Sequence, residues 1–275
     1  MHDTFKGYVA PWECDEMEHM NIQFFADKFS QSLLRHLFFL GESSKGTPGT
    51  LRALHMRFHK ELHASDLAAA HGEVSAFEKE NGVLTHFMRN EESGALAATA
   101  SFHLPLEKMP DEVAPLANEA APRGLTPGLL FRPGMEAHEG LTETNLSAVG
   151  GHECSAEGGF SLKGYFSRLS DCQGHMWRLA GLGRQEQKAR GLATATVELH
   201  FQFFGALGED DLIAVHTGLD AVGSKTLHYR HIFFNGKTGA PVAAADGIGL
   251  LFDKETRRAI ALPEAVHESA AYHRL

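Results

Sequence analysis

The sequence lacks the features by which membrane, exported and nucleic-acid-binding proteins are usually recognised. No apolar run approaches the roughly 20 residues that a transmembrane helix needs. Residues 1–6 have neither the basic start nor the apolar core of a secretory signal, so we expect a cytoplasmic protein. Basic side chains are too few for a surface that binds nucleic-acid phosphates, because the sequence has 25 Lys and Arg against 35 Asp and Glu and a formal charge of −10. We therefore predict neither a membrane partner nor a nucleic-acid partner.

Cysteine is scarce as well. The three cysteines, Cys14, Cys154 and Cys172, are an odd number without metal-ligand spacing, which argues against a disulfide framework and against a structural zinc site. The sequence also contains no glycine-rich phosphate loop and no Gly-x-Ser-x-Gly elbow. Neither a nucleotide-phosphate loop nor a serine-hydrolase elbow is therefore predicted.

Histidine, by contrast, is abundant, and 18 residues of this type suggest a metal site. His55, His59 and His63 have the spacing of a metal-binding helix face. The alternation of apolar and polar residues over 54–59 predicts a strand instead, in which four residues span about 13 Å, too far for one ion. We predict no metal site and no cofactor.

An internal repeat is the most informative feature of the sequence. Leu54–Leu67 aligns without a gap with Leu199–Leu212 and is identical to it at six positions. Further identities follow at the same offset: His71 with His216, His86 with His231, and Asn90 with Asn235. Self-similarity over this length predicts that the chain consists of two copies of one structural unit.

Upstream of these strands, an Asp-His pair relates the two copies. Asp15 with His19 corresponds to Asp171 with His175 at a slightly larger offset, as Lys6-Gly7-Tyr8 corresponds to Lys163-Gly164-Tyr165. The second copy is then shorter between its Asp-His pair and its strands.

The stretch between the copies is rich in Pro, Gly, Ala and Glu and has no sustained periodicity, which is typical of a connector. We therefore predict an N-terminal domain over residues 1–120, a connector over 121–158 and a C-terminal domain over 159–275.

Each copy has the pattern of a helix followed by strands. Apolar residues recur at helical spacing over Asn21–Leu40, and Gly41 suits the end of a helix. The second helix is expected over 175–190, where Gly181 and Gly183 each cost about 1 kcal/mol relative to alanine. Four strand patterns follow each helix. An antiparallel sheet wrapped around a long apolar helix is an α+β architecture, which is the predicted fold class.

The candidate catalytic residues precede the two predicted helices: Asp15, His19 and Asn21 in the first copy, Asp171 and His175 in the second. Unpaired N–H groups at a helix start polarise a carbonyl and stabilise its oxyanion. A nearby carboxylate acts on water as a general base or attacks directly. Such a minimal site suits thioesters, whose thiolate leaves with little acid assistance. Structural roles remain open: a helix cap for Asp15 or Asn21, and a packed ring for His19.

Four basic residues of the second predicted helix allow two interpretations. Arg178, Arg184, Lys188 and Arg190 form either a solvent-exposed face or a receptor for nucleotide phosphates. Arg178 and Arg184 are the candidates for binding the CoA part of a substrate.

The segment Trp12–Asn21, WECDEMEHMN, is followed by an aromatic-rich helix and resembles the signature of the 4-hydroxybenzoyl-CoA thioesterase-like hotdog family. Gly174-His175-Met176 matches part of the same signature in the second copy. The stretch Leu54–Leu67 is similar to that family's second strand and acidic turn. The resemblance covers most of both halves and implies a tandem, double-hotdog chain.

The resemblance implies hydrolysis of an acyl-CoA or acyl-carrier-protein thioester to free acid and thiol, with CoA present only as part of the substrate. The family's catalytic carboxylate position falls on Asp15 and also on Asp171. The tandem arrangement further resembles acyl-carrier-protein thioesterases, whose Asp-x-Asn-x-His pattern is met at Asp15 and His19. Met17 stands in place of their asparagine, and Glu18 stands where many relatives have glycine.

Two other functions fit the same residues. Enoyl-thioester hydration uses this fold and an Asp-His pair, and a non-catalytic protein could bind acyl-CoA in the same groove. The sequence leaves open the acyl-chain preference, the carrier, the number of working sites and a homodimer of two double-hotdog chains.

Overall fold

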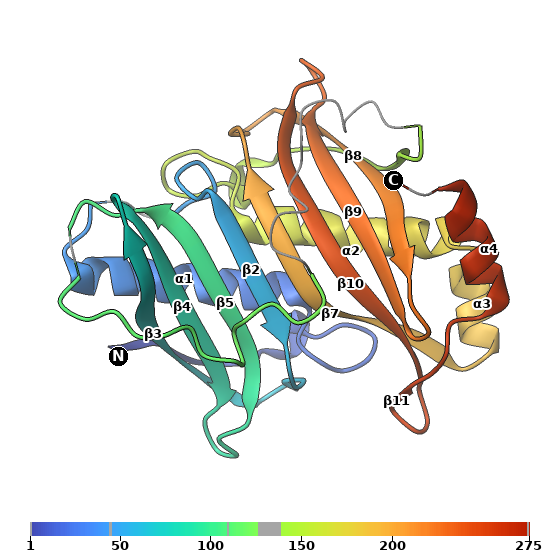
Figure 1. Ribbon diagram of the computed structural model, residues 1–275, viewed down its shortest axis with the longest axis horizontal. Helices are drawn as coiled ribbons and strands as arrows, with labels where there is room; N and C mark the ends of the chain where they lie inside the picture. Colours follow the sequence, from blue (N-terminus) through green and yellow to red (C-terminus); the bar gives the residue numbers. More distant parts are fainter. Residues whose placement is uncertain (1, 44–45, 109, 126–138, 274) are drawn as a thin grey trace. The chain divides into compact units, whose positions relative to one another are not determined.

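The structure is a computed structural model that describes residues 2–43, 46–108, 110–125, 139–273 and 275. It divides into two compact units, which are described separately. The first comprises Met1–Pro122 with His152–Ser167, and the second comprises Arg123–Gly151 with Arg168–Leu275. Antiparallel strands and long helices make up both, which confirms the predicted α+β class (Figure 1).

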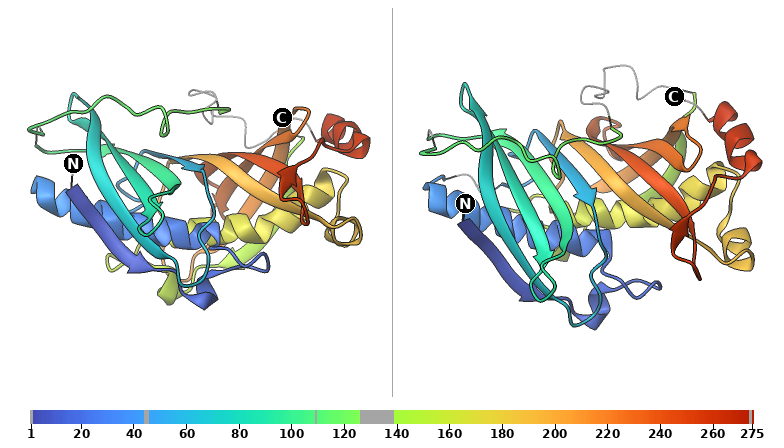
Figure 2. Two further views of the ribbon diagram at one scale, coloured as in Figure 1. Left: turned by 90° about the horizontal axis from the view of Figure 1, so that it is seen from below. Right: turned by 60° about the horizontal axis from the view of Figure 1, so that its bottom comes forward.

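The first unit follows the expected order of strand, helix and four strands. Its elements are β1 (His2–Tyr8), η1 (Pro11–Glu13), α1 (Ile22–Leu40), β2 (Ala53–Phe58), β3 (Leu67–Glu78), β4 (Asn81–Asn90) and β5 (Leu96–Pro105). The strands lie in the order β1-β3-β4-β5-β2, and all neighbouring pairs are antiparallel. Because side chains alternate along a strand, every second residue faces α1, which lies along one side of this sheet (Figure 2).

The second repeat has the same order with additions. Its elements are β6 (Thr142–Ala148), η3 (Gly151–Glu153), α2 (Leu162–Leu179), α3 (Arg184–Ala189), β7 (Leu192–Phe203), β8 (Leu212–Val222), β9 (Thr226–Asn235), β10 (Pro241–Asp253), β11 (Arg258–Ala259) and α4 (Glu264–Tyr272). The strands lie in the order β7-β10-β9-β8-β6, and β11 pairs with β10.

The repeat is present, but its upstream part was predicted in the wrong place. Strands β2–β5 and β7–β10 correspond at the predicted offset, so that Asn81 corresponds to Thr226, 145 residues later. Before these strands the offset is 140 residues, and β1 corresponds to β6, η1 to η3 and α1 to α2. The second copy is thus longer between helix and strands, not shorter.

The same shift corrects two further predictions. Lys163-Gly164-Tyr165 lies in α2, so it does not correspond to Lys6-Gly7-Tyr8 in β1. The predicted connector over 121–158 contains β6, which pairs with β8, and η3, so that this part belongs to the second repeat. Residues 126–138 of the connector lie outside the described residues.

The boundaries of α1 follow from its terminal residues. Asn21 caps the start, with its side-chain oxygen accepting a hydrogen bond from the backbone N–H of Gln23 at 3.0 Å. Gly41 ends the helix with a φ of 69°, a left-handed conformation that glycine adopts without strain. In the second repeat the helix predicted over 175–190 is wrong, because α2 ends at Leu179 and a separate helix, α3, begins at Arg184 after the N-cap residue Gly183.

The far side of the first sheet is covered by the chain that follows β5. The Arg57 guanidinium donates to the carbonyls of Asn118 and Ala121, both at 2.9 Å, and Ala114 N donates to Val74 O at 2.8 Å. Figure 2 shows this segment on the side of the sheet opposite α1. The far face of this sheet is therefore partly covered, at β2 and β3.

A chain of buried polar side chains joins α1 to the sheet. Ser32 Oγ lies 2.7 Å from Thr4 Oγ1 and 2.6 Å from His86 Nδ1, and His86 Nε2 lies 3.2 Å from His36 Nδ1. Burial lowers the pKa of His36 to about 4 and holds the pKa of His86 well below its ordinary value. Both rings are consequently neutral at neutral pH.

The second repeat keeps part of this arrangement. Thr217 Oγ1 lies 2.6 Å from both Thr144 Oγ1 and His231 Nδ1. The residue that corresponds to His36 is Met176, and His231 Nε2 has no hydrogen-bond partner among the described residues. Burial lowers the pKa of His231 to about 3. The second repeat therefore tolerates a buried imidazole whose second nitrogen is unpaired.

We expect His36→Met, which copies the second repeat, to make the protein less sensitive to acid. A histidine in the unfolded chain takes up a proton near pH 6.5, whereas folded His36 does so near pH 4. The unfolded state binds more protons between these values, so stability falls as pH falls. By pH 5 this one residue costs about 2 kcal/mol.

Urea unfolding at pH 7 and pH 5 measures the effect. The variant should lose less of its unfolding free energy between the two pH values than the parent does. His152→Met, at an exposed position, is the control and should behave as the parent. Equal losses in His36→Met and the parent would show that the buried ring contributes nothing to acid sensitivity.

Candidate functional site

The loop before α1 is a short hairpin that brings Asp15 and His19 opposite each other. Cys14 and Met20 form an antiparallel bridge, and Asp15 N donates to His19 O at 3.0 Å. Glu18 N donates back to Asp15 O at 3.0 Å, and Glu18 has a φ of 64°. This left-handed conformation is costly for a residue with a side chain and is one that glycine adopts without strain.

A buried ion pair fixes this hairpin to the helix. Lys28 Nζ lies 2.8 Å from Glu13 Oε1, and Glu13 Oε2 accepts a hydrogen bond from Ala10 N at 3.0 Å. Lys28 also donates to Tyr8 O at 3.3 Å. The two charged side chains are only 7% and 11% exposed. Since the ion pair joins β1, η1 and α1, it determines where the hairpin lies.

The Asp15 carboxylate and the His19 imidazole lie side by side. Asp15 Oδ1 accepts a hydrogen bond from Met17 N at 2.8 Å, which fixes the carboxylate plane. Its other oxygen lies 3.4 Å from His19 Nδ1. The Asp15 side chain is 29% exposed and that of His19 is 16% exposed. A carboxylate oriented by the backbone, partly accessible and beside an imidazole is equipped for general-base chemistry on water.

Asn21 is the helix cap, so the suggestion that Asp15 fills this role is wrong. The backbone N–H of Asn21 donates to Glu13 O at 2.9 Å, and its side-chain oxygen is used by the cap. Asn21 therefore connects the hairpin to the helix.

Glu61 is a neighbour of the site that sequence reasoning missed. Its Oε1 lies 3.5 Å from His19 Nε2, on the side of the ring away from Asp15. The segment carrying Glu61 follows β2 and is held against the hairpin, because Met20 N donates to Leu62 O at 2.7 Å. The internal repeat contained a sign that Glu61 is special. Glu61 aligns with Ala206, so the two copies differ in charge at this position.

Cys14, next to Asp15, is not suited to act as a nucleophile. Burial and the adjacent negative charges of Asp15 and Glu13 raise the pKa of its thiol. The thiolate, which is the reactive form, is therefore disfavoured.

The second repeat contains the same hairpin without the reactive side chains. Ser155 N donates to Gly159 O at 2.8 Å, Gly158 N donates to Ser155 O at 2.9 Å, and Cys154 and Phe160 form the bridge. Gly158, with a φ of 81°, takes the place of Glu18. The backbone is thus reproduced bond for bond, while Ser155 and Gly159 replace the aspartate and the histidine.

Asp171 and His175 lie within α2, not before it, and their predicted position at a helix start is wrong. Both are exposed, and they follow the true hairpin of the second repeat by more than ten residues. The error has a simple origin. Gly174-His175-Met176 matches a short signature by chance, and a spacing of four residues is compatible with a loop as well as with a helix.

Arg178 and Arg184 are exposed, the first near the end of α2 and the second at the start of α3. The two belong to different helices, whereas one helix was expected. Their suggested role in binding phosphates stays a prediction.

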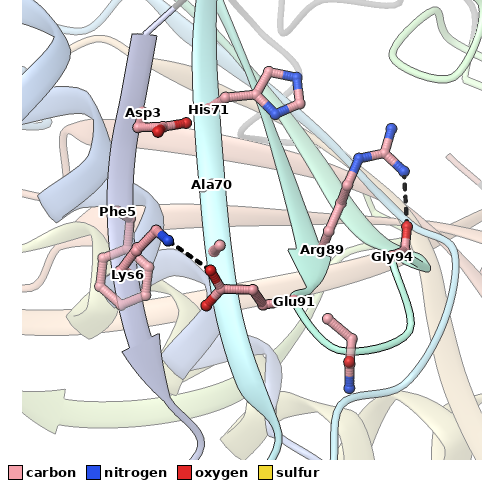
Figure 3. A pocket seen from close by; sticks show the side chains of 10 residues that line it. Asp3, Phe5, Lys6, Ala70, His71, Arg89, Glu91 and Gly94 are labelled. Atoms are coloured by element: carbon pink, nitrogen blue, oxygen red, sulfur yellow. Dashed lines mark hydrogen bonds and ion pairs between the residues drawn. The ribbon is translucent and has the colours of Figure 1, made fainter.

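A pocket of about 200 Å³ lies at the β1 edge of the first sheet (Figure 3). Lys6 and Glu91, which line it, form an ion pair of 2.6 Å, and the lining Arg89 donates to Gly94 O at 3.1 Å. None of the predicted site residues lines this pocket. The hairpin before α1 therefore remains the candidate site.

The described residues contain neither a candidate metal-ligand cluster nor a candidate membrane-spanning helix. No group of three or more His, Cys, Asp or Glu side chains in these residues is placed to hold a metal ion. Within the same residues, no helix is both long and apolar enough to cross a membrane.

Comparison with known proteins identifies the fold. Residues 149–269 match the model of the thioesterase-like superfamily. A candidate oleoyl thioesterase from Lactobacillus plantarum is similar in structure, with a TM-score of 0.66, 10% identity, and coverage of 90% of this chain and 94% of the other. A 12:0-ACP thioesterase from Umbellularia californica gives a TM-score of 0.62, 12% identity, and coverage of 90% and 93%. The chain is a double-hotdog protein.

An acyl-ACP thioesterase from Bacteroides thetaiotaomicron agrees with this double-hotdog assignment, with a TM-score of 0.63 at 8% identity over 89% of this chain and 96% of the other. No curated protein matches the sequence. The predicted hotdog fold and the resemblance to thioesterases are confirmed.

The match to the superfamily model falls on the second half of this double-hotdog chain. That half carries Ser155 and Gly159 in its hairpin, whereas the Asp-His pair lies in the other half. The fold is therefore present in both repeats, but the candidate chemistry is present in one.

Proposed function

We propose that this double-hotdog protein hydrolyses an acyl thioester, carried by CoA or by an acyl-carrier protein, at a single centre formed by Asp15 and His19. The observation that carries the proposal is the position of the Asp15 carboxylate, held by Met17 N on one oxygen and facing His19 with the other. The superfamily of the second repeat and the fold of the whole chain support the reaction class.

In the proposed reaction, Asp15 accepts a proton from water while the water oxygen bonds to the thioester carbonyl carbon. The tetrahedral intermediate then breaks its carbon–sulfur bond, and the leaving thiolate takes up the proton from Asp15. The products are the free acid and the thiol, and no cofactor is consumed. Direct attack by Asp15 to give an anhydride, which water then cleaves, leads to the same products and also requires the ionised carboxylate.

One centre per chain follows from the comparison of the two hairpins. Ser155 offers a hydroxyl where the first hairpin has a carboxylate, and Gly159 has no side chain to set beside it. A serine without a neighbouring base is a poor acceptor for a proton from water.

A thiol-release screen tests the proposal. The purified chain is given acyl-CoA and acyl-carrier-protein substrates with short, long and aromatic acyl groups, and free thiol is followed with a disulfide dye. We expect release with at least one substrate, at one active centre per chain. Loss of enoyl absorbance without thiol release would show a hydratase instead, and stoichiometric acyl-CoA binding without turnover would show a binding protein.

A further inference from the structure

We propose that the pocket at the β1 edge of the first sheet binds a small dipolar molecule, whose anionic group lies against Arg89 and whose ammonium group lies against Asp3 (Figure 3). Amino acids and aminoalkyl phosphates share these two groups and form the ligand class. The inference is independent of the proposed thioester hydrolysis, because the pocket is lined by none of residues 14–20, which form the Asp-His hairpin.

Strand register explains why a pocket forms at this place. Lys6, Ala69 and Arg89 form one row across β1, β3 and β4, so their side chains lie on the same face of the sheet. Asp3 and His71 form the next row on that face, because residues two apart in a strand point to the same side. The methyl group of Ala69 lies between two long side chains. The middle of the row is therefore hollow, and the cavity measures about 200 Å³.

The charges that line the pocket are only partly paired. Lys6 and Glu91 form an ion pair of 2.6 Å and neutralise each other. Arg89 donates one hydrogen bond, to Gly94 O at 3.1 Å, and within the described residues neither Arg89 nor Asp3 forms an ion pair. A guanidinium has five N–H donors in a planar fork, which fits a carboxylate or a phosphate. Arg89 is thus available to an anion and Asp3 to a cation.

His71 lies between these two charges. Figure 3 shows Asp3 and Arg89 on opposite sides of its ring, which stacks on Phe87 with the ring centroids 5.0 Å apart. Burial and the charge of Arg89 lower the pKa of His71, whereas Asp3 raises it. The ring is therefore uncharged at neutral pH and adds no third charge.

The charge balance of the pocket favours a dipolar ligand. Two cations, Lys6 and Arg89, and two carboxylates, Asp3 and Glu91, line it, so the net charge is zero. A simple anion near Arg89 also meets the negative field of Asp3, and a simple cation near Asp3 meets the positive field of Arg89. A molecule with both groups has a favourable interaction at each end.

The second repeat has the same backbone at this place. Its strands repeat the pairs that form the pocket: Glu143 with His216, Leu146 with Ala214, and Phe234 with Ala214. The bulge between Asp3 and Phe5 recurs between Glu143 and Asn145.

The charged side chains, in contrast, are specific to the first repeat. Lys6, Arg89 and Glu91 correspond in order to Leu146, Phe234 and Gly236. The shared register shows that this backbone folds without the three charges. Their presence in the first repeat is consequently explained better by a ligand than by folding.

Isothermal titration calorimetry on the whole chain tests the ligand class with glycine, 4-aminobutyrate and phosphoethanolamine. We expect saturable binding of at least one of these probes, at one site per chain. Acetate and methylammonium, which carry one group each, should bind at least about tenfold more weakly, because charge-assisted hydrogen bonds at one end are lost. Tighter binding of phosphoethanolamine than of both amino acids would assign a phosphate to Arg89, and the reverse order would assign a carboxylate.

Two variants place the ligand in the pocket. Arg89→Phe copies the second repeat, and Asp3→Asn removes an exposed carboxylate, so both should fold, which urea unfolding verifies. Each should weaken binding of the best probe at least about tenfold. Arg52→Phe, the same substitution at an exposed arginine outside the pocket, is the matched control and should bind within about twofold of the parent.

Three results would overturn the inference. They are the absence of saturable binding with all three dipolar probes, acetate binding as tightly as the best of them, and unchanged binding in folded Arg89→Phe or Asp3→Asn. None of these results bears on thiol release, so the proposed thioester hydrolysis is tested separately.

Discussion

Asp15→Asn is expected to lower kcat for thiol release by about three orders of magnitude, within the range that general acid–base groups contribute. The substitution is nearly isosteric. The asparagine side-chain oxygen can still accept the hydrogen bond from Met17 N that the structure shows at 2.8 Å. What is lost is the negative charge that takes a proton from water or attacks the carbonyl. KM and the free energy of unfolding should change little.

Asp171→Asn is the matched control, because it removes the carboxylate of the other Asp-His pair. Asp171 lies within α2 and is exposed, so we expect kcat within about twofold of the parent, the range of an uninvolved surface residue. Thiol release is measured on both variants with the best substrate of the screen, and unfolding in urea verifies that both are folded. Full activity of folded Asp15→Asn would remove Asp15 from the mechanism.

Lys28→Met is expected to cost about 3–5 kcal/mol of unfolding free energy, as breaking a buried ion pair typically does. The substitution leaves the Glu13 carboxylate 11% exposed and without its cation. Glu13 cannot move into solvent without giving up the hydrogen bond from Ala10 N at 3.0 Å. Because the same pair holds the hairpin, activity should fall together with stability.

Two variants control this prediction. Lys6→Met breaks an ion pair of similar length whose side chains are 65% and 41% exposed, and it should cost less than about 1 kcal/mol. Adding Glu13→Gln to Lys28→Met should restore part of the loss, since no buried charge is then unpaired. Urea unfolding of all three variants measures these changes in unfolding free energy. Similar losses for Lys28→Met and Lys6→Met would contradict the role assigned to burial of the ion pair.

Local sequence signals were reliable where one element determines its own limits. Asn21 and Gly41 bound α1 as predicted, since a capping side chain and a left-handed glycine act within a few residues. The repeat of β2–β5 as β7–β10 was equally readable from identities at one offset.

The second hairpin shows where such signals fail. Asp171 and His175 carry the right residue types at the right spacing, yet α2 begins at Leu162 and includes both. The true counterpart of the Asp-His hairpin contains Ser155 and Gly159 in place of the aspartate and the histidine, so a search for an Asp-His pair does not find it. Only its hydrogen bonds, which repeat those around Asp15, identify it.

The sequence by itself determined the α+β class, the duplication, the first helix and the Asp15–His19 motif, because each depends on periodicity, identity or spacing along the chain. Tertiary structure alone decided that Asp171 and His175 lie within α2 and not in a hairpin like that of Asp15 and His19, and that Glu61 lies 3.5 Å from His19. The physical reason is that strand pairing brings together residues far apart in sequence, and their spacing along the chain does not show that they are close in space.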